Sequence, residues 1–183
     1  MAEEEQKFEI QKIFLRDVSF ESPNSPEIFR EKWKPKTDIQ IGAQNSKIND
    51  DLYEVTLSVT VTAKQEDKTA FLVELKQSGV FLIKNFPQQQ LNQLLGSYCP
   101  HTLFPFAREA VSDFIGKGGF PPMLLSPVNF DALYAQQLAK LKAQQPSEKD
   151  IKHYTNVRLP FKQRTRCRGM GNGPGGTSGP ASL

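Results

Sequence analysis

Within the segment 52–63, residues 53–63 alternate strictly between apolar and polar side chains, and no other feature constrains the fold of this chain as strongly. A period of two is typical of a β-strand that buries one face and leaves the other wet. The apolar series is Tyr53, Val55, Leu57, Val59, Val61 and Ala63. The intervening series is Glu54, Thr56, Ser58, Thr60 and Thr62.

Three further segments alternate in the same way, at residues 8–21, 36–47 and 69–75. In the first, we expect the even positions from Phe8 to Phe20 to form one mostly apolar face, with Asp17 and Glu21 on the other. Gly79 is expected to mark a bulge before a last strand segment at 80–83. Short polar turns join these segments, with no helix expected between them, so we predict a four-stranded antiparallel sheet.

Residues 22–35 form a segment of another kind, because three prolines rule out regular strand pairing there. The segment nevertheless carries Ile28, Phe29 and Trp33. We therefore expect an extended arm that crosses over another element and packs its large side chains on it.

The pattern becomes helical after Pro87. We predict a short helix at 88–96, a longer helix at 100–116 with Pro105 near its start, and a last helix capped by Asn129. The expected apolar stripe of the longer helix is Leu103, Phe106, Ala107, Ala110, Val111, Phe114 and Ile115. That of the last helix is Phe130, Leu133, Tyr134, Gln137, Leu138 and Leu141. A sheet followed by helices indicates the α+β class.

Composition divides the chain at about residue 145. Residues 1–145 carry 16 basic and 18 acidic side chains, whereas residues 146–183 carry seven basic and two acidic ones. The second part ends in a run rich in Gly, Ser and Pro that cannot build a core. We predict one folded domain at 1–145 and a basic, then Gly/Pro/Ser-rich, disordered tail at 146–183.

The residue types needed for catalysis or metal binding do not cluster in the sequence. Cys99 and His101 lack further ligands nearby, and residues two apart on a helix do not face each other. The run Gly116–Gly119 follows a helix and lacks the ending of a phosphate-binding loop, so it is better read as a helix terminator. We expect no enzyme, no cofactor and no metal.

Partners are constrained by charge and hydropathy. The mildly acidic domain argues against nucleic acid. No apolar run is long enough for a membrane span or a signal peptide, which predicts a cytoplasmic protein without stable membrane insertion. The apolar side chains of the arm and of residues 120–125 exceed what one small sheet face needs. They either pack over the core or form a surface for partners.

Several motifs of this chain, in the same order, resemble the bacterial protein-export chaperone family SecB. They are Asp-Val-Ser-Phe-Glu-Ser-Pro-Asn (17–24), the strand at 53–63, Gly-Ser-Tyr-Cys-Pro (96–100), Leu-Phe-Pro-Phe-Ala-Arg-Glu (103–109) and Pro-Val-Asn-Phe-Asp-Ala-Leu-Tyr (127–134). The resemblance covers roughly residues 8–143. It implies a sheet with helices packed on one side, assembled as a homotetrameric dimer of dimers.

The resemblance also implies a function. Family members are non-catalytic chaperones that hold unfolded precursor proteins and deliver them to the translocation ATPase SecA. The alternative from the residues alone is an adaptor subunit that uses the same apolar surface for one folded partner.

The resemblance assigns roles to particular positions. The SecA-contact positions fall on Asp17, Glu21, Leu72 and Glu74. The subunit-pairing positions fall on Val73, Leu75 and Gln77. The client groove would be lined by Phe29, Trp33, Phe130 and Tyr134. The weak acidity of the domain and the basic tail depart from the strongly acidic character usual in the family.

Overall fold

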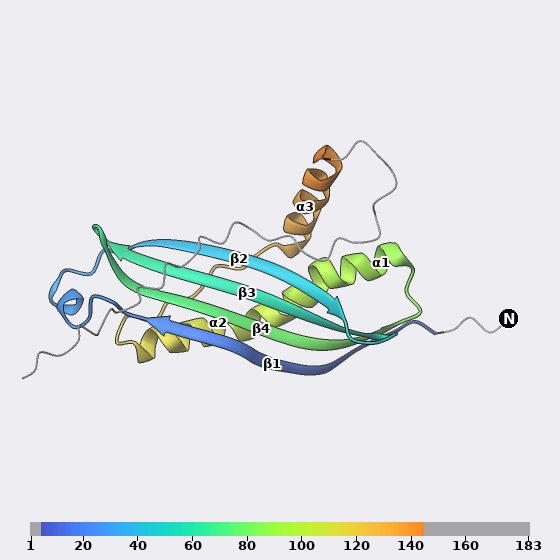
Figure 1. Cartoon of the computed structure of the whole chain (residues 1–183), viewed down its shortest axis with the longest axis horizontal. Helices are drawn as coiled ribbons and strands as arrows, with labels where there is room; N and C mark the ends of the chain where they lie inside the picture. The colour runs from blue at the N-terminus through green and yellow to red at the C-terminus, as the bar shows by residue number, and fades with distance from the viewer. Residues whose placement is uncertain (1–4, 145–183) are drawn as a thin grey trace, which may run out of the picture.

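The computed structural model of the chain describes residues 5–144, which form one antiparallel sheet with helices (Figure 1). The elements in chain order are β1 (Lys7–Glu21), the 3-10 helix η1 (Glu27–Arg30), β2 (Lys36–Lys47), β3 (Leu52–Gln65), β4 (Lys68–Lys84), α1 (Gln88–Gln93), the π-helical turn η2 (Leu94–Tyr98), α2 (Cys99–Lys117) and α3 (Phe130–Gln144). The predicted tail at 146–183 lies outside the described residues.

The sheet has the strand order β1-β4-β3-β2, and every neighbouring pair is antiparallel. The hairpins β2–β3 and β3–β4 are consecutive in the chain. β1 instead pairs with β4, so the arm at residues 22–35 carries the chain from one edge of the sheet to the other. The α+β class and the four-stranded antiparallel sheet predicted from the sequence are confirmed.

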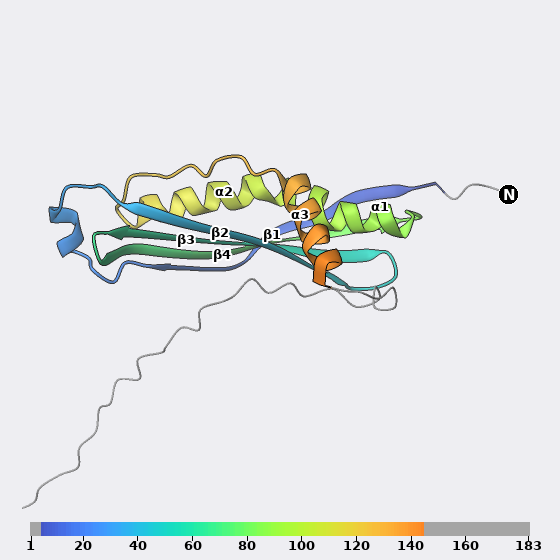
Figure 2. The same cartoon turned by 90° about the horizontal axis from the view of Figure 1, so that it is seen from above.

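Helix α2 covers one face of the sheet, mostly over β4 and β3 (Figure 2). The apolar series of β3 points into this layer, and Val55, Leu57, Val59 and Val61 have no exposed surface. Burial of each such side chain contributes about 1.5–3 kcal/mol relative to exposure. The helix side of the core is Leu103, Phe104, Ala107, Val111 and Ile115.

The assignment of one continuous apolar face to β1 was wrong. Register shifts lie between Ile10 and Lys12 and between Leu15 and Asp17, so the strand contains an extra residue at each place. Each bulge shifts the phase of the side chains by one position. As a result Ile13 and Leu15 pair with Gly79 and Gln77 on the core face. Even-numbered Phe14 pairs with Ser78 and faces the other way.

Gly79 does not mark a bulge. β4 runs without interruption from Lys68 to Lys84, and Gly79 pairs with both Ile13 and Val55. A Cβ at Gly79 would lie 2.8 Å from the Phe81 ring and 2.9 Å from a methyl group of Leu103. The glycine therefore allows α2 to approach the sheet closely.

The helices also differ in detail from the prediction. α1 and α2 are joined through η2, whose π-helical turn spans Leu94–Tyr98. Pro105 consequently lies inside α2, six residues after Cys99, and not near its start. Phe106, assigned to the apolar stripe, is 48% exposed, whereas Phe104 is buried in its place. The arm is not wholly extended either, because η1 forms within it and buries Ile28.

Candidate docking and client surfaces

The face of the sheet opposite α2, here called the open face, carries the four expected SecA-contact residues. Asp17 pairs with Lys76, Glu21 with Leu72, and Glu74 with Ser19 on one side and Thr60 on the other. The bulge after Leu15 keeps Asp17 and Glu21 on this face. The structure therefore brings Asp17, Glu21, Leu72 and Glu74 together in adjacent rows of β1 and β4.

The Asp17 carboxylate lies 3.5 Å from Nζ of Lys76, and its side chain is 65% exposed. An exposed ion pair of this length contributes little to stability and can exchange partners. Neighbouring positions on β3 are Ser58, Thr60 and Thr62, which gives the open face a hydroxyl-rich background. Such a surface is suited to polar docking and not to core packing.

Val73, Leu75 and Gln77, the expected subunit-pairing positions, lie on the core face of β4. Their exposed fractions within the single chain are 0%, 2% and 4%. They are thus covered by α2 of their own chain. Any effect of these residues on subunit pairing would have to act through the position of α2.

Phe29 and Trp33 lie in an aromatic cluster at the end of the sheet where the arm crosses. Phe120, which follows α2, is its centre: its ring lies 4.9 Å from Phe29, 5.3 Å from Trp33 and 5.0 Å from Phe71 between centroids. Trp33 is half-buried, whereas Phe29 is 49% exposed. Trp33 therefore anchors the arm, and Phe29 presents an open aromatic surface.

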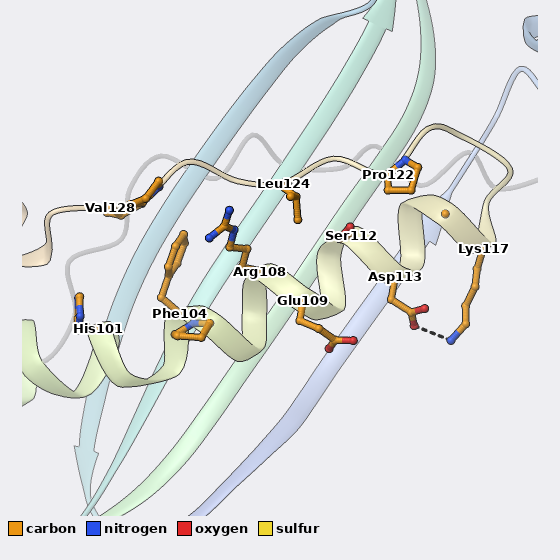
Figure 3. Close-up of a pocket in the computed structure, with 13 residues that line it drawn as sticks. His101, Phe104, Arg108, Glu109, Ser112, Asp113, Lys117, Pro122, Leu124 and Val128 are labelled. Atoms are coloured by element: carbon orange, nitrogen blue, oxygen red, sulfur yellow. Dashed lines mark hydrogen bonds and ion pairs between the residues drawn. The ribbon is translucent and has the colours of Figure 1, made fainter.

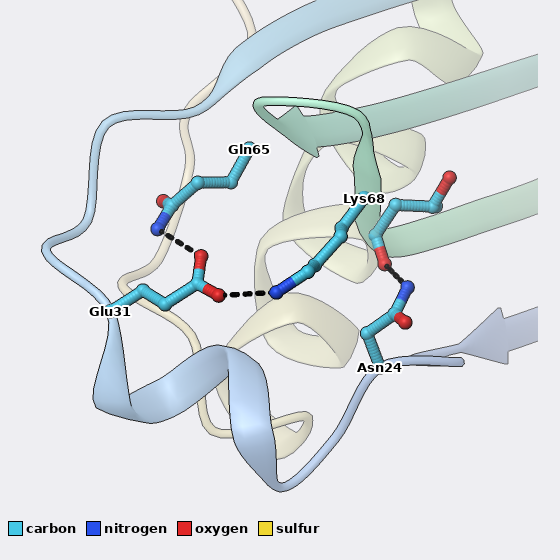
Figure 4. Close-up of polar contacts among 5 residues, drawn as sticks. Asn24, Glu31, Gln65 and Lys68 are labelled. Atoms are coloured by element: carbon cyan, nitrogen blue, oxygen red, sulfur yellow. Dashed lines mark hydrogen bonds and ion pairs between the residues drawn. The ribbon is translucent and has the colours of Figure 1, made fainter.

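Polar contacts fasten the arm to the β3–β4 hairpin (Figure 4). Nζ of Lys68 donates to Glu31 at 2.7 Å, and the Gln65 amide donates to the same carboxylate at 3.1 Å. Nearby, the Asn24 amide donates to the backbone carbonyl of Thr69 at 2.9 Å. The hydrogen bond between the two side chains lowers the pKa of Glu31 and raises the pKa of Lys68.

Phe130 and Tyr134 belong to a different cluster, near the start of α2. The Phe130 ring lies 5.7 Å from Phe104 and 6.2 Å from His101. A Cβ at Gly96 would lie 2.4 Å from the Tyr134 ring, so α3 packs directly on the backbone of η2. Burial raises the pKa of the Tyr134 hydroxyl. The four expected groove residues are thus divided between two clusters.

The start of α3 agrees with the prediction. The Asn129 side chain accepts a hydrogen bond from the Ala132 backbone N–H at 2.9 Å, which is an N-cap contact. The Ser97 hydroxyl also donates to Asp131 at 2.5 Å, tying the helix to η2. Leu133 and Leu138, placed on the apolar stripe of this helix, are 37% and 39% exposed.

A groove of about 770 Å³ runs along α2 between the two clusters, below the connector at residues 120–129 (Figure 3). Phe104 and Arg108 point toward Leu124 and Val128 of the connector, and Leu124 is 69% exposed. Nε of Arg108 is buried without a hydrogen-bond partner among the described residues. The sequence signal for this groove was the proline-rich apolar connector, which did not reveal that it lies along α2.

The described residues offer little to nucleophilic or metal chemistry. Cys99 is buried, and desolvation raises the pKa of its thiol to about 12, which keeps it protonated at neutral pH. Within residues 5–144 no group of three His, Cys, Asp or Glu side chains is placed to hold a metal ion. In the same range, no helix is both long and apolar enough to cross a membrane.

Known proteins resemble this chain closely in sequence. The family described as preprotein translocase subunit SecB matches residues 1–141. The protein-export protein SecB of Methylococcus capsulatus is 56% identical over 140 residues, covering 76% of this chain and 90% of the relative. That of Nitrosococcus oceani is 57% identical over 133 residues, covering 72% and 81%. That of Pseudomonas aeruginosa PAO1 is 49% identical over 142 residues, covering 77% and 87%.

One solved structure supports the same fold. It is the SecB-like chaperone of Mycobacterium tuberculosis in complex with a peptide from an antitoxin, which matches with a TM-score of 0.55 at 16% identity. The match covers 66% of this chain and 90% of the solved chain.

Proposed function

Since this chain belongs to the SecB family, we propose that it is an export chaperone that binds unfolded precursor proteins and keeps them competent for translocation. The observation that carries the proposal is the exposed apolar surface along one side of the molecule. Phe29 and Leu124 are 49% and 69% exposed on the arm and on the connector, which meet where Phe29 contacts Phe120. Apolar side chains exposed in this way favour binding of other polypeptides.

The client surface that we propose extends from the aromatic cluster of Phe29, Trp33, Phe71 and Phe120, here called the arm cluster, along the groove to the cluster of Phe130 and Tyr134. Each contact alone is weak, because the burial of a few side chains is offset by the cost of ordering the client. Affinity then comes from one client chain that occupies several such surfaces at once. This mode selects for unfolded, extended chains and uses no cofactor and no catalytic step.

We further propose that the open face, through Asp17, Glu21, Leu72 and Glu74, docks the chaperone on SecA in the cytoplasm. Exposed carboxylates mainly set the rate and specificity of an encounter with a basic partner. The open face and the client surface lie on opposite sides of the sheet. A client and SecA can therefore be bound at the same time.

Assembly as a dimer of dimers completes the proposal. It is supported by β1, an edge strand whose core-face residues Ile10 and Leu15 extend beyond the cover of α2 and are each 43% exposed. Long apolar edge strands favour pairing with another chain. No observation favours the adaptor alternative with a single folded partner.

The client surface is tested with Phe29→Ser combined with Leu124→Ser. We expect this double variant to lose most of its suppression of the aggregation of a denatured precursor, because it removes two exposed apolar contacts. Ile48→Ser is the matched control, since Ile48 is 54% exposed but lies in the β2–β3 loop. Equal suppression by the double variant and the wild type, with unchanged circular dichroism, would reject the client surface.

SecA docking is tested separately by calorimetry. Asp17→Lys combined with Glu74→Lys is expected to weaken SecA binding and to leave aggregation suppression intact. Glu9→Lys combined with Asp67→Lys makes the same change in charge at the ends of the sheet and serves as the control. If the two double variants lose SecA affinity equally, net charge and not the open face governs docking.

A further inference from the structure

We propose that Arg108, with Ser112 one turn further along α2, donates hydrogen bonds to alternate backbone carbonyls of an extended client segment in the groove along α2. This inference rests on the proposed use of that groove for clients. It makes Arg108 the residue that holds the main chain of a client, independently of the client's side chains.

One row of α2 forms the floor of the groove. Four of the lining residues follow one another at intervals of four along the helix: Phe104, Arg108, Ser112 and Gly116. Residues four apart lie on the same face of a helix, about 6 Å apart along its axis. The row is therefore about 18 Å long. At Gly116 an added Cβ would meet only Pro122, at 3.9 Å, so this end of the row is open.

The guanidinium of Arg108 lacks an acceptor. It forms no ion pair within residues 5–144, and its Nε is buried there without a hydrogen-bond partner. Figure 3 shows the side chain directed toward the connector, whereas Glu109 points away from it. Asp113 is already engaged, because Nζ of Lys117 donates to it at 2.6 Å. A buried donor without an acceptor is costly, so the groove favours a ligand that brings an acceptor to Arg108.

The charges of the groove favour a neutral acceptor over a carboxylate. Its lining contains two cations, Arg108 and Lys117, and two carboxylates, Glu109 and Asp113. With His101 neutral, these formal charges cancel, and the lining has no excess charge that would attract an anion. A backbone carbonyl brings an acceptor without a charge, and a carbonyl that is buried in the groove itself needs a donor.

The spacing of the two donors matches an extended chain. In such a chain the carbonyls that point to one side recur at every second residue, about 6.6–6.8 Å apart. Arg108 and Ser112 lie about 6 Å apart along α2, and the long Arg108 side chain can adjust to the difference. About five or six extended residues span the whole row. A helical segment uses its carbonyls within its own helix and offers none to Arg108, so the site selects unfolded segments.

Three labelled peptides of equal length test the proposal by fluorescence anisotropy with the full chain. They share an apolar, Val- and Ser-rich sequence and differ at one central position, which is Ser, Glu or Lys. Arg108→Met keeps an apolar stem and removes the donors. We expect it to weaken the binding of all three peptides by the same factor, roughly tenfold. Lys12→Met, at an exposed position of β1, removes the same charge and should leave all three affinities unchanged.

Arg108→Lys keeps the charge but lacks the Nε donor, and it should bind all three peptides about threefold or more weakly than the wild type. This variant carries the test if Arg108→Met loses the circular dichroism of the wild type, and wild-type affinity in Arg108→Lys overturns the proposal.

Three other results overturn it as well. A loss confined to the Glu peptide would assign Arg108 to a side-chain carboxylate. A lower native mass of folded Arg108→Met would place Arg108 at a contact with a second copy of the chain. Absence of binding of the Ser peptide to the wild type would exclude a main-chain site. Suppression of the aggregation of a denatured precursor by the wild type reports the proposed chaperone function separately from all of these results.

Discussion

Val73 provides a test of the buried position of the expected pairing residues. It has no exposed surface and lies on β4 beneath α2. Val73→Ala removes two buried methyl groups, which should lower the free energy of unfolding by about 1.5–3 kcal/mol. Val73→Asp places an unpaired carboxylate in the same position, at a cost of several kcal/mol. Since domains are stable by about 5–15 kcal/mol, Val73→Asp should be largely unfolded or aggregated.

Urea unfolding followed by circular dichroism, together with native mass at two protein concentrations, checks this prediction. A core residue lowers stability through the fold of each chain, so the loss for Val73→Ala should be similar at both concentrations. A residue that acts only in pairing would show its effect through the association equilibrium, which depends on concentration. Folded, stable monomers or dimers of Val73→Asp with an unchanged spectrum would refute the placement beneath α2.

Two further predictions concern the positions of α3 and of the arm. Gly96→Ala should displace α3, because the new Cβ would lie 2.4 Å from the Tyr134 ring. Faster amide hydrogen exchange in residues 130–141 would reveal the displacement, and unchanged exchange there would argue against this packing. The contact between Glu31 and Lys68 should loosen in acid, because the pKa of Glu31 is lowered in the folded state. The stabilisation that ionised Glu31 gives the fold is present above the ordinary pKa of 4.5 and is lost as the pH falls through the folded-state pKa. The emission of Trp33, the single tryptophan, should therefore change between pH 7 and acid while circular dichroism stays constant, and Glu31→Gln should show the acid spectrum already at pH 7. An emission that is the same in both proteins at every pH would contradict the role of Glu31.

The sequence predicted those strands in which every residue continues the alternation of side chains between the two faces of the sheet. β3 alternates without error, so both of its faces, and those of the matching rows of β4, could be assigned. The same reasoning failed in β1, because an extra residue at a bulge changes the phase while leaving a pattern that still resembles alternation. Ile13 and Leu15 were placed on the wrong face for this reason.

The candidate site likewise has residues that the sequence pattern predicts and residues that it does not. Glu74 on the open face follows from the regular alternation of β4, whereas Asp17 and Glu21 lie there because the second bulge of β1 restores the phase that the first one shifts. The proximity of Phe130 to Phe104, and the groove below Leu124, depend on how the connector folds back along α2. That path is set by tertiary packing at Phe120 and at Gly96, which no local pattern encodes.

In the proposed client surface, a client that contacts both aromatic clusters must exceed a minimum length. Phe104, which contacts Phe130, lies 14 residues before Gly118. A Cβ at Gly118 would touch the ring of Phe20, which in turn contacts Phe71 and Phe120 of the arm cluster. Along a helix this is about 21 Å. An extended polypeptide bridges that distance with about six residues, whereas a client segment that is already helical needs about 14. On this proposal, shorter exposed stretches, such as the loops of a folded protein, reach one cluster but not both, and the distance between the clusters favours unfolded over folded chains.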